Sequence, residues 1–348
     1  MRPTLFLTAA AAGLAFTAAA CAETESETVS GTASETASET ASETAAETAT
    51  ASAQDGQDAA DEAPHSEPAD PQQAAYAAAV SGAPDSAWRT VDPEDLLKIT
   101  TSEGVIWVEL ADAFAPAHTA RMRALARQDW YDFKVWHRVL DDFMAQGGGA
   151  MDDPSVTPPT DPMEAEFTIR RDPSDLEVTE IQERVINPRS NRSRAPAGFW
   201  NGFPVATQPA AAAGVMGDGR VDSWLIHCDG AAAMARTQDP NSANAQFYIV
   251  RGDAEHLNTQ YTVWGKVRDG HEVTYALNEG TLGQDRGFQP SFIEDVEVAA
   301  DLGEDARPSI EVMDTASAAF SDYLAALEDA SGETPDVCDI DVPVRVSE

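Results

Sequence analysis

Apolar and polar residues alternate along several short stretches of the chain, and this alternation predicts β-strands. In "GVIWVEL", Ile106, Val108 and Leu110 fall on one face and Trp107 and Glu109 on the other, as in a strand with one buried side. Further stretches of this kind are "FKVWHRVL" at 133–140, "AQFYIV" at 245–250 and residues 262–267.

Helical signals are fewer. Pro116 suits a first helical turn, and Ala120, Ala124 and Leu125 after it can share one helix face. A second helix is expected near 272–278, after the strand at 262–267. Many strands with few helices favour an antiparallel sheet or barrel over a doubly wound fold.

The first 20 residues have the pattern of a signal peptide, with Arg2 followed by a short apolar run and small residues. The run is too short to span a bilayer comfortably. "AAAC" resembles a bacterial lipobox, which would make Cys21 a lipid attachment site; ordinary cleavage after the same alanines is the alternative. We therefore expect a periplasmic protein, anchored by lipid to the envelope membrane.

Residues 21–73 are rich in Ser, Thr, Glu and Ala, with almost no large apolar side chains. Such a segment buries too little surface to offset its ordering entropy, so we expect a disordered acidic tether. Folding should begin between Gln72 and Asp92, after a short helix near 74–80. The formal net charge of −38 argues against nucleic acid as a partner, because phosphate binding needs clustered Lys and Arg.

Cysteine usage points to one disulfide. Once Cys21 is set aside, Cys228 and Cys338 are the cysteines left in a chain that we expect to be exported. Two free thiols are the alternative. Residues 301–348 form an acidic extension with one helical stretch, "SAAFSDYLAALEDA", and the bridge would hold this extension against residue 228.

Three motifs then identify a family by resemblance. "FKVWHRVLDDFMAQGGG" from Phe133, "MARTQDPNSANAQFYIV" from Met234 and "HLNTQYTVWGKVRDG" from His256 resemble the signatures of cyclophilins, in the family's order. The resemblance implies an all-β fold with two capping helices, a closed eight-stranded antiparallel β-barrel over 92–300. It also implies peptidyl-prolyl cis-trans isomerase activity. Residues 151–230 would be a long insertion.

The resemblance also assigns the site. Arg138 would be the catalytic donor, and Gln146 and Gln246 would orient the substrate carbonyl and hold Arg138 in place. The substrate proline would bind against Phe143, Met144, Tyr248 and Leu257, an extended substrate would pair with the backbone of Ala235 and Arg236, and Tyr261 stands where eukaryotic members have histidine. His256 replaces the tryptophan of cyclosporin-sensitive members.

This chemistry explains why the motifs carry no nucleophile. Rotation about a peptide bond has a barrier of about 18 to 20 kcal/mol, and it breaks no covalent bond. A dry pocket and a donor to the twisted amide are sufficient. We expect no cofactor, and the histidines lack HExxH or similar spacing, so we expect no metal site.

The expected partners are unfolded or partly folded proteins with exposed X-Pro segments, whose folding outside the cytoplasm a monomeric enzyme would accelerate. A non-catalytic chaperone or scaffold that binds Pro-containing peptides, and a purely structural envelope lipoprotein, are the alternatives. The insertion at 151–230 shows no recognisable motif. It would form either an extra hairpin beside the groove, from "GFWNGFPVATQP" and from "VMGDGRVDSW", the second with a tight turn at Asp218-Gly219, or a lid that narrows substrate choice.

Overall fold

The computed structural model describes residues 70–149, 160–185, 194–215 and 217–347. The predicted signal peptide, the lipid attachment site at Cys21 and the tether up to residue 69 lie outside the described residues. So do residue 150 and, within the insertion, residues 151–159, 186–193 and 216.

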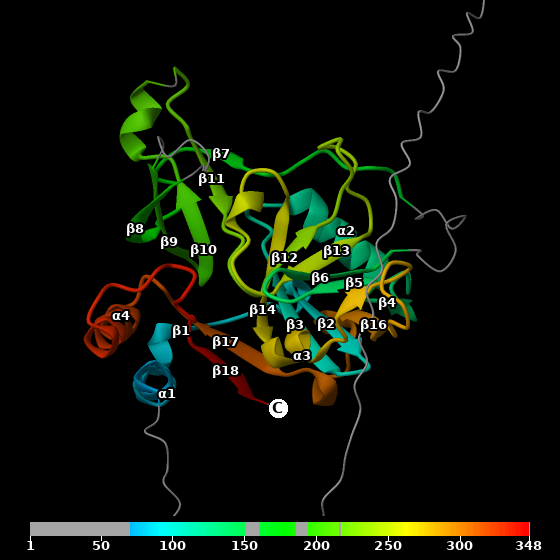
Figure 1. Cartoon of the computed structure of the whole chain (residues 1–348). Helices are drawn as coiled ribbons and strands as arrows, with labels where there is room; N and C mark the ends of the chain where they lie inside the picture. Colours follow the sequence, from blue (N-terminus) through cyan, green and yellow to red (C-terminus); the bar gives the residue numbers. More distant parts are fainter. Residues whose placement is uncertain (1–69, 150–159, 186–193, 216, 348) are drawn as a thin grey trace, which may run out of the picture. The chain divides into compact units, whose positions relative to one another are not determined.

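The largest sheet contains the strands that the alternation predicted (Figure 1). All of its strand pairs are antiparallel, in the order β15-β5-β6-β13-β12-β14-β3-β2-β16-β4. Its strands are β2 (Leu96–Thr101), β3 (Gly104–Leu110), β4 (Lys134–Val135), β5 (Arg138–Leu140), β6 (Met144–Gly147), β12 (Ala231–Met234), β13 (Phe247–Val250), β14 (Val263–Asp269), β15 (Gly280–Thr281) and β16 (Phe292–Val298).

The fold is mostly β with few helices, as predicted, but the expected closed eight-stranded barrel is replaced by a ten-stranded sheet. The stretch 133–140, expected as one strand, is divided at Trp136 and His137. Its first part, β4, pairs with β16, whereas β5 pairs with β6 and β15. β15 was not predicted, because two residues are too few to show an alternation of apolar and polar positions.

Two helices pack on this sheet. α2 (Pro116–Ala126) begins at the expected proline and buries Met122 and Leu125 in the main core. α3 (His271–Ala276) lies against β3 and follows Gly270, whose φ of 73° suits glycine. In the core, the Phe247 ring meets Trp136 and Trp264 edge-on, at centroid distances of 5.4 and 5.9 Å. Short 3-10 helices span Asp85–Ala87, Pro93–Asp95, Ala210–Gly214, Glu255–Leu257, Ala299–Asp301 and Glu304–Ala306.

The described part of the insertion forms a second antiparallel sheet, in the order β7-β11-β10-β9-β8. Its hairpin turns at Asn201 and Gly202, where both φ angles are positive, the geometry of a tight turn that favours Asn-Gly. No such tight turn occurs at Asp218-Gly219, because β11 begins only at Val221 and the connection before it contains a 3-10 helix. The strands are β7 (Ile169–Arg171), β8 (Thr179–Val185), β9 (Arg194–Trp200), β10 (Phe203–Thr207) and β11 (Val221–Leu225).

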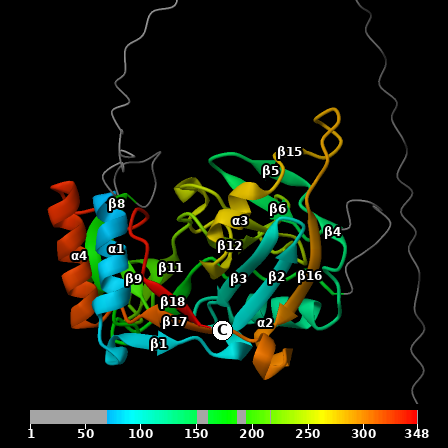
Figure 2. The same ribbon diagram turned by 90° about the horizontal axis from the view of Figure 1, so that it is seen from below.

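A third sheet joins the two ends of the folded part. β17 (Ser309–Met313) pairs with β1 (Trp88–Thr90) on one side and with β18 (Val344–Ser347) on the other. Beside it, α1 (Pro71–Gly82) packs against α4 (Ala318–Ser331) (Figure 2). Arg345 of β18 donates to the carbonyls of Val80 and Ala83, and its guanidinium lies 4.0 Å from the ring centroid of Trp88.

These elements share a second hydrophobic core with the insertion. Phe199 and Trp224 of the insertion sheet pack there with Trp88 and with Phe320 and Leu327 of α4. The expected boundaries at residues 92 and 301 therefore fall within one packed unit. Among the residues that the structure describes, no helix combines the length and the apolar character needed to cross a membrane.

A disulfide joins Cys228 and Cys338, whose Cα atoms lie 5.0 Å apart. It connects the end of the insertion to the segment between α4 and β18. The C-terminal segment is thereby linked to the insertion.

Candidate active site

One cavity of about 200 Å³ brings together every predicted catalytic and substrate-binding residue except Gln246. Its walls come from β5, β6 and β13, from the segment after β12, and from the 3-10 helix Glu255–Leu257 with the loop that follows. The residues that line it are Arg138, Phe143, Met144, Gln146, Ala235, Arg236, Tyr248, Leu257 and Tyr261.

Strand register explains this convergence. Arg138 of β5 stands opposite Gln146 of β6, and Gln146 stands opposite Tyr248 of β13. Directly opposed residues of antiparallel strands project from the same face. Met144 lies two residues before Gln146 and shares that face. A single row across three strands thus supplies the polar end and the apolar floor of the cavity.

Arg138 is half-buried and keeps its charge unpaired within the part of the chain that the structure describes. Its Nη1 lies 3.7 Å from the sulfur of Met144, and its Cζ lies 5.6 Å from the ring centroid of Phe143. Among the described residues, no carboxylate forms an ion pair with it. Donor hydrogens of the guanidinium are therefore available to a bound peptide.

The two glutamines hydrogen-bond to each other and not to Arg138. Gln146 donates from Nε2 to Oε1 of Gln246 at 3.1 Å. The expectation that they hold Arg138 is thus not met in this structure. Arg138 instead turns toward the apolar Met144 and Phe143.

The segment after β12 also differs in part from expectation. The backbone N–H of Ala235 already donates to the carbonyl of Gln246 at 2.9 Å, so that N–H is not available to an extended substrate. Arg236 donates to the carbonyls of Gln260 and Thr237, and its guanidinium lies 4.2 Å from the ring centroid of Tyr261. Arg236 therefore acts as a fixed wall of the cavity.

The apolar part of the cavity can hold a proline ring. Met144 and Tyr248 are buried, and Phe143 and Leu257 are half-buried around them. The Tyr261 ring meets Tyr248 edge-on at a centroid distance of 6.0 Å. Such a hollow, apolar with a few polar groups at one end, is typical of small-ligand sites.

A histidine from the insertion lies behind this hollow. His227 Nε2 is 3.1 Å from the hydroxyl of Tyr248, and its Nδ1 is 3.0 Å from Oδ1 of Asn258. Burial lowers the pKa of His227 to about 4 and raises the pKa of Tyr248 well above its usual value. His227 was not among the residues predicted for the site. The available signal was Tyr248 itself, because a buried phenol needs a hydrogen-bond partner.

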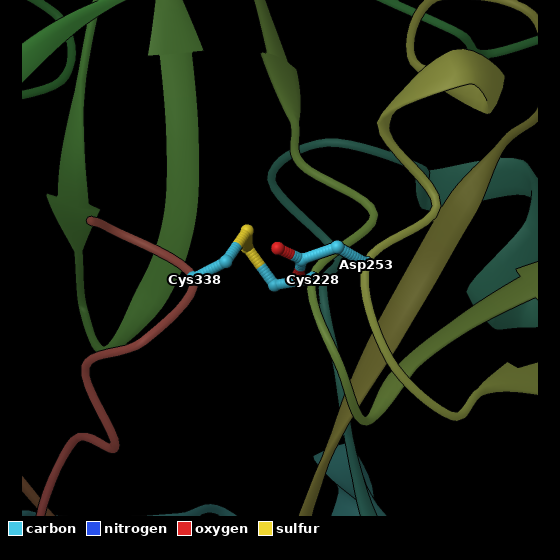
Figure 3. A group of neighbouring side chains, drawn as sticks. All are labelled: Cys228, Asp253 and Cys338. Atoms are coloured by element: carbon cyan, nitrogen blue, oxygen red, sulfur yellow. A yellow bond between two sulfur atoms is a disulfide. The ribbon is translucent and has the colours of Figure 1, made fainter. Parts of the chain in front are cut away.

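Outside the cavity, one cluster combines side chains of the types that bind metal ions in other proteins (Figure 3). A carboxylate oxygen of Asp253 and the sulfurs of Cys228 and Cys338 lie within 4.8 Å of one another. The sulfurs are bonded to each other and so are not thiolate ligands. Burial raises the pKa of Asp253 to about 6, against the opposing charge of Arg184.

Comparisons with known proteins agree with this geometry. The family model described as "Cyclophilin type peptidyl-prolyl cis-trans isomerase/CLD" matches residues 96–298. A "Probable peptidyl-prolyl cis-trans isomerase" of Brucella suis is 29% identical over 208 residues, which cover 60% of this chain and 83% of that protein. "Peptidyl-prolyl cis-trans isomerase cyp18" of Streptomyces antibioticus is 30% identical over 201 residues, covering 56% and 89%.

A solved structure extends the likeness beyond the main sheet. The cyclophilin AquaCyp293 from Hirschia baltica is 33% identical and superposes with a TM-score of 0.63, covering 74% of this chain and 93% of its own. The matched family model spans more than half of the 348 residues. On this evidence the chain belongs to the cyclophilin-type peptidyl-prolyl cis-trans isomerases.

Proposed function

We propose that the cavity around Arg138 is the active site of this isomerase and that Arg138 is its catalytic residue. The observation that carries the proposal is the position of an arginine without a carboxylate partner, among the described residues, at the rim of an apolar hollow. Gln146, paired with Gln246, would hold the substrate carbonyl at the same end.

The arrangement fits the electronic change during rotation. When the X-Pro amide twists, the nitrogen lone pair leaves resonance with the carbonyl and becomes able to accept a hydrogen bond. A guanidinium donor then stabilises the twisted amide more than either planar form, and such differential binding lowers the barrier. Met144, Tyr248 and Leu257 would hold the pyrrolidine ring beneath it.

A protease-coupled assay with a proline-containing peptide tests this role. Arg138→Ala should lower kcat/KM by about 10² to 10³, the usual cost of removing one donor to a transition state. Arg170→Ala is the matched control, because Arg170 pairs with Asp218 and Asp222 away from the cavity, and it should stay within about twofold of wild type. Equal rates above the uncatalysed background would overturn the role of Arg138. A wild type without activity would leave a non-catalytic peptide-binding module as the explanation.

We further propose that the protein assists folding of exported proteins as a lipid-anchored periplasmic monomer without nucleic-acid partners. The pattern of residues 1–21 supports export and a lipid at Cys21. The disulfide also supports an oxidising compartment, since cytosolic thiols stay reduced. X-Pro isomerisation takes about 10 to 100 s at 25 °C, long enough to limit the folding of such clients.

Labelling with a radioactive fatty acid in a bacterial host tests the anchor. Wild type should carry the label and sediment with membranes, and Cys21→Ala should do neither. Refolding of an exported protein whose slow phase is X-Pro isomerisation tests the client class. A slow phase that the active enzyme leaves unchanged would remove the proposed folding role.

A further inference from the structure

The insertion contributes one side chain to the back of the proline pocket. His227 follows β11 directly and precedes the disulfide residue Cys228. Its carbonyl accepts a hydrogen bond from the N–H of Ala254, and its own N–H donates to Oδ1 of Asn258 at 2.9 Å. The histidine is fully buried. These two hydrogen bonds of its backbone fix the position of His227.

The hydrogen-bond pattern assigns the proton positions. Oδ1 of Asn258 can only accept, so Nδ1 of His227 carries the proton that it donates at 3.0 Å. In a neutral imidazole the other nitrogen is then an acceptor. Nε2 of His227 consequently accepts a hydrogen bond from the hydroxyl of Tyr248, at 3.1 Å. The two rings stack at a centroid distance of 6.2 Å.

We propose that His227 is a positioning residue for proline binding, because it allows Tyr248 to present an apolar ring to the substrate. The inference rests on the proposed function. Without His227, the Tyr248 hydroxyl would be a buried donor lacking its acceptor. The ring would rotate toward water or admit a water molecule into the space that the proline needs. The insertion thereby supports the substrate pocket from behind.

A double-mutant cycle tests the coupling. His227→Leu removes the acceptor and should raise KM, lowering kcat/KM by about tenfold or more, the usual effect of leaving a buried donor unpaired. kcat should change little, because the proline ring occupies the pocket equally in the planar and twisted forms. In the Tyr248→Phe background, which has no hydroxyl to satisfy, His227→Leu should change kcat/KM by less than about twofold.

The control is His118→Leu. His118 is also fully buried, but it is bonded to Glu166 and does not line the cavity. Any effect of His118→Leu should be the same in both backgrounds. An equal loss from His227→Leu with and without the Tyr248 hydroxyl would overturn the inference, whereas an inactive wild type would overturn the proposed function instead.

A measurement on the wild-type protein keeps the inference testable if His227→Leu does not fold. Long-range ¹H–¹⁵N NMR spectra distinguish protonated from unprotonated ring nitrogens. We expect His227 to be neutral at pH 7, with the proton on Nδ1 and with a slowly exchanging Tyr248 hydroxyl. A proton on Nε2 would exclude the proposed hydrogen bond.

Discussion

Removing the disulfide should destabilise the protein by about 5 kcal/mol. Cys228 and Cys338 are 110 residues apart in sequence, and the chain-entropy model assigns about 5 kcal/mol to closing a loop of that length. With an unfolding entropy of about 2.1 cal/mol/K per residue over the roughly 260 residues that the structure describes, the loss corresponds to about 9 °C in Tm. The perturbation is the double substitution Cys228→Ala and Cys338→Ala.

Thermal and urea unfolding followed by circular dichroism measure this loss. Reductant added to the wild type should reproduce the shift of the double variant, and reductant added to the variant should change nothing further. A drop in Tm of less than about 2 °C would refute the reasoning. It would mean that the unfolded chain gains little freedom when the bridge is absent.

Three further predictions concern single side chains. Phe320→Ala should cost about 3 to 5 kcal/mol in urea unfolding, because Phe320 is fully buried and meets the ring of Phe199 at 5.5 Å; a cost below about 1 kcal/mol would contradict the second core. Gly202→Ala should cost about 1 to 2 kcal/mol by the same measurement, since Gly202 has a φ of 77° and an added Cβ would meet Val312 at 2.7 Å; an unchanged urea midpoint would contradict this. Finally, His227 is neutral in the fold because its pKa is lowered from 6.5 to about 4, so the unfolded chain takes up a proton first as the pH falls. Between pH 6.5 and 4 wild type should lose about 3 kcal/mol of stability that His227→Leu does not lose; parallel pH profiles of the two proteins would exclude a depressed pKa.

Local alternation predicted several strands of the main sheet, and the residues of the cavity were predicted by the resemblance of the three motifs to cyclophilins. The alternation in 104–110 became β3, and the helix expected after Pro116 became α2. The motif residues converged because strand register is regular, so that opposed residues share a face. The motifs could not predict the pairing of the polar groups, because a motif gives residue types and not the hydrogen-bond partners of long side chains, as the bond from Gln146 to Gln246 shows.

The rest of the fold depends on pairings between residues far apart in the sequence. β1 has three residues, too few for a readable period, and its partner β17 lies more than 200 positions later. In the insertion, β9 is buried along nearly its whole length and contains Ala, Pro and Gly, so it shows no alternation. His227 could not be placed because its role depends on contacts with Tyr248 and Asn258.

The covering of Trp88 and the end of α1 by Arg345 has a consequence for biosynthesis. A ribosome adds about 5 to 20 residues per second, so roughly 220 residues, or about 11 to 44 s of elongation, separate β1 from its strand partner β17, and Arg345 is added later still. During that delay the nascent chain exposes the apolar indole of Trp88 and the unpaired edge of β1. A chain that ended before Ser309 would expose the indole and the strand edge permanently. Proteases that degrade incompletely folded proteins would be expected to remove it.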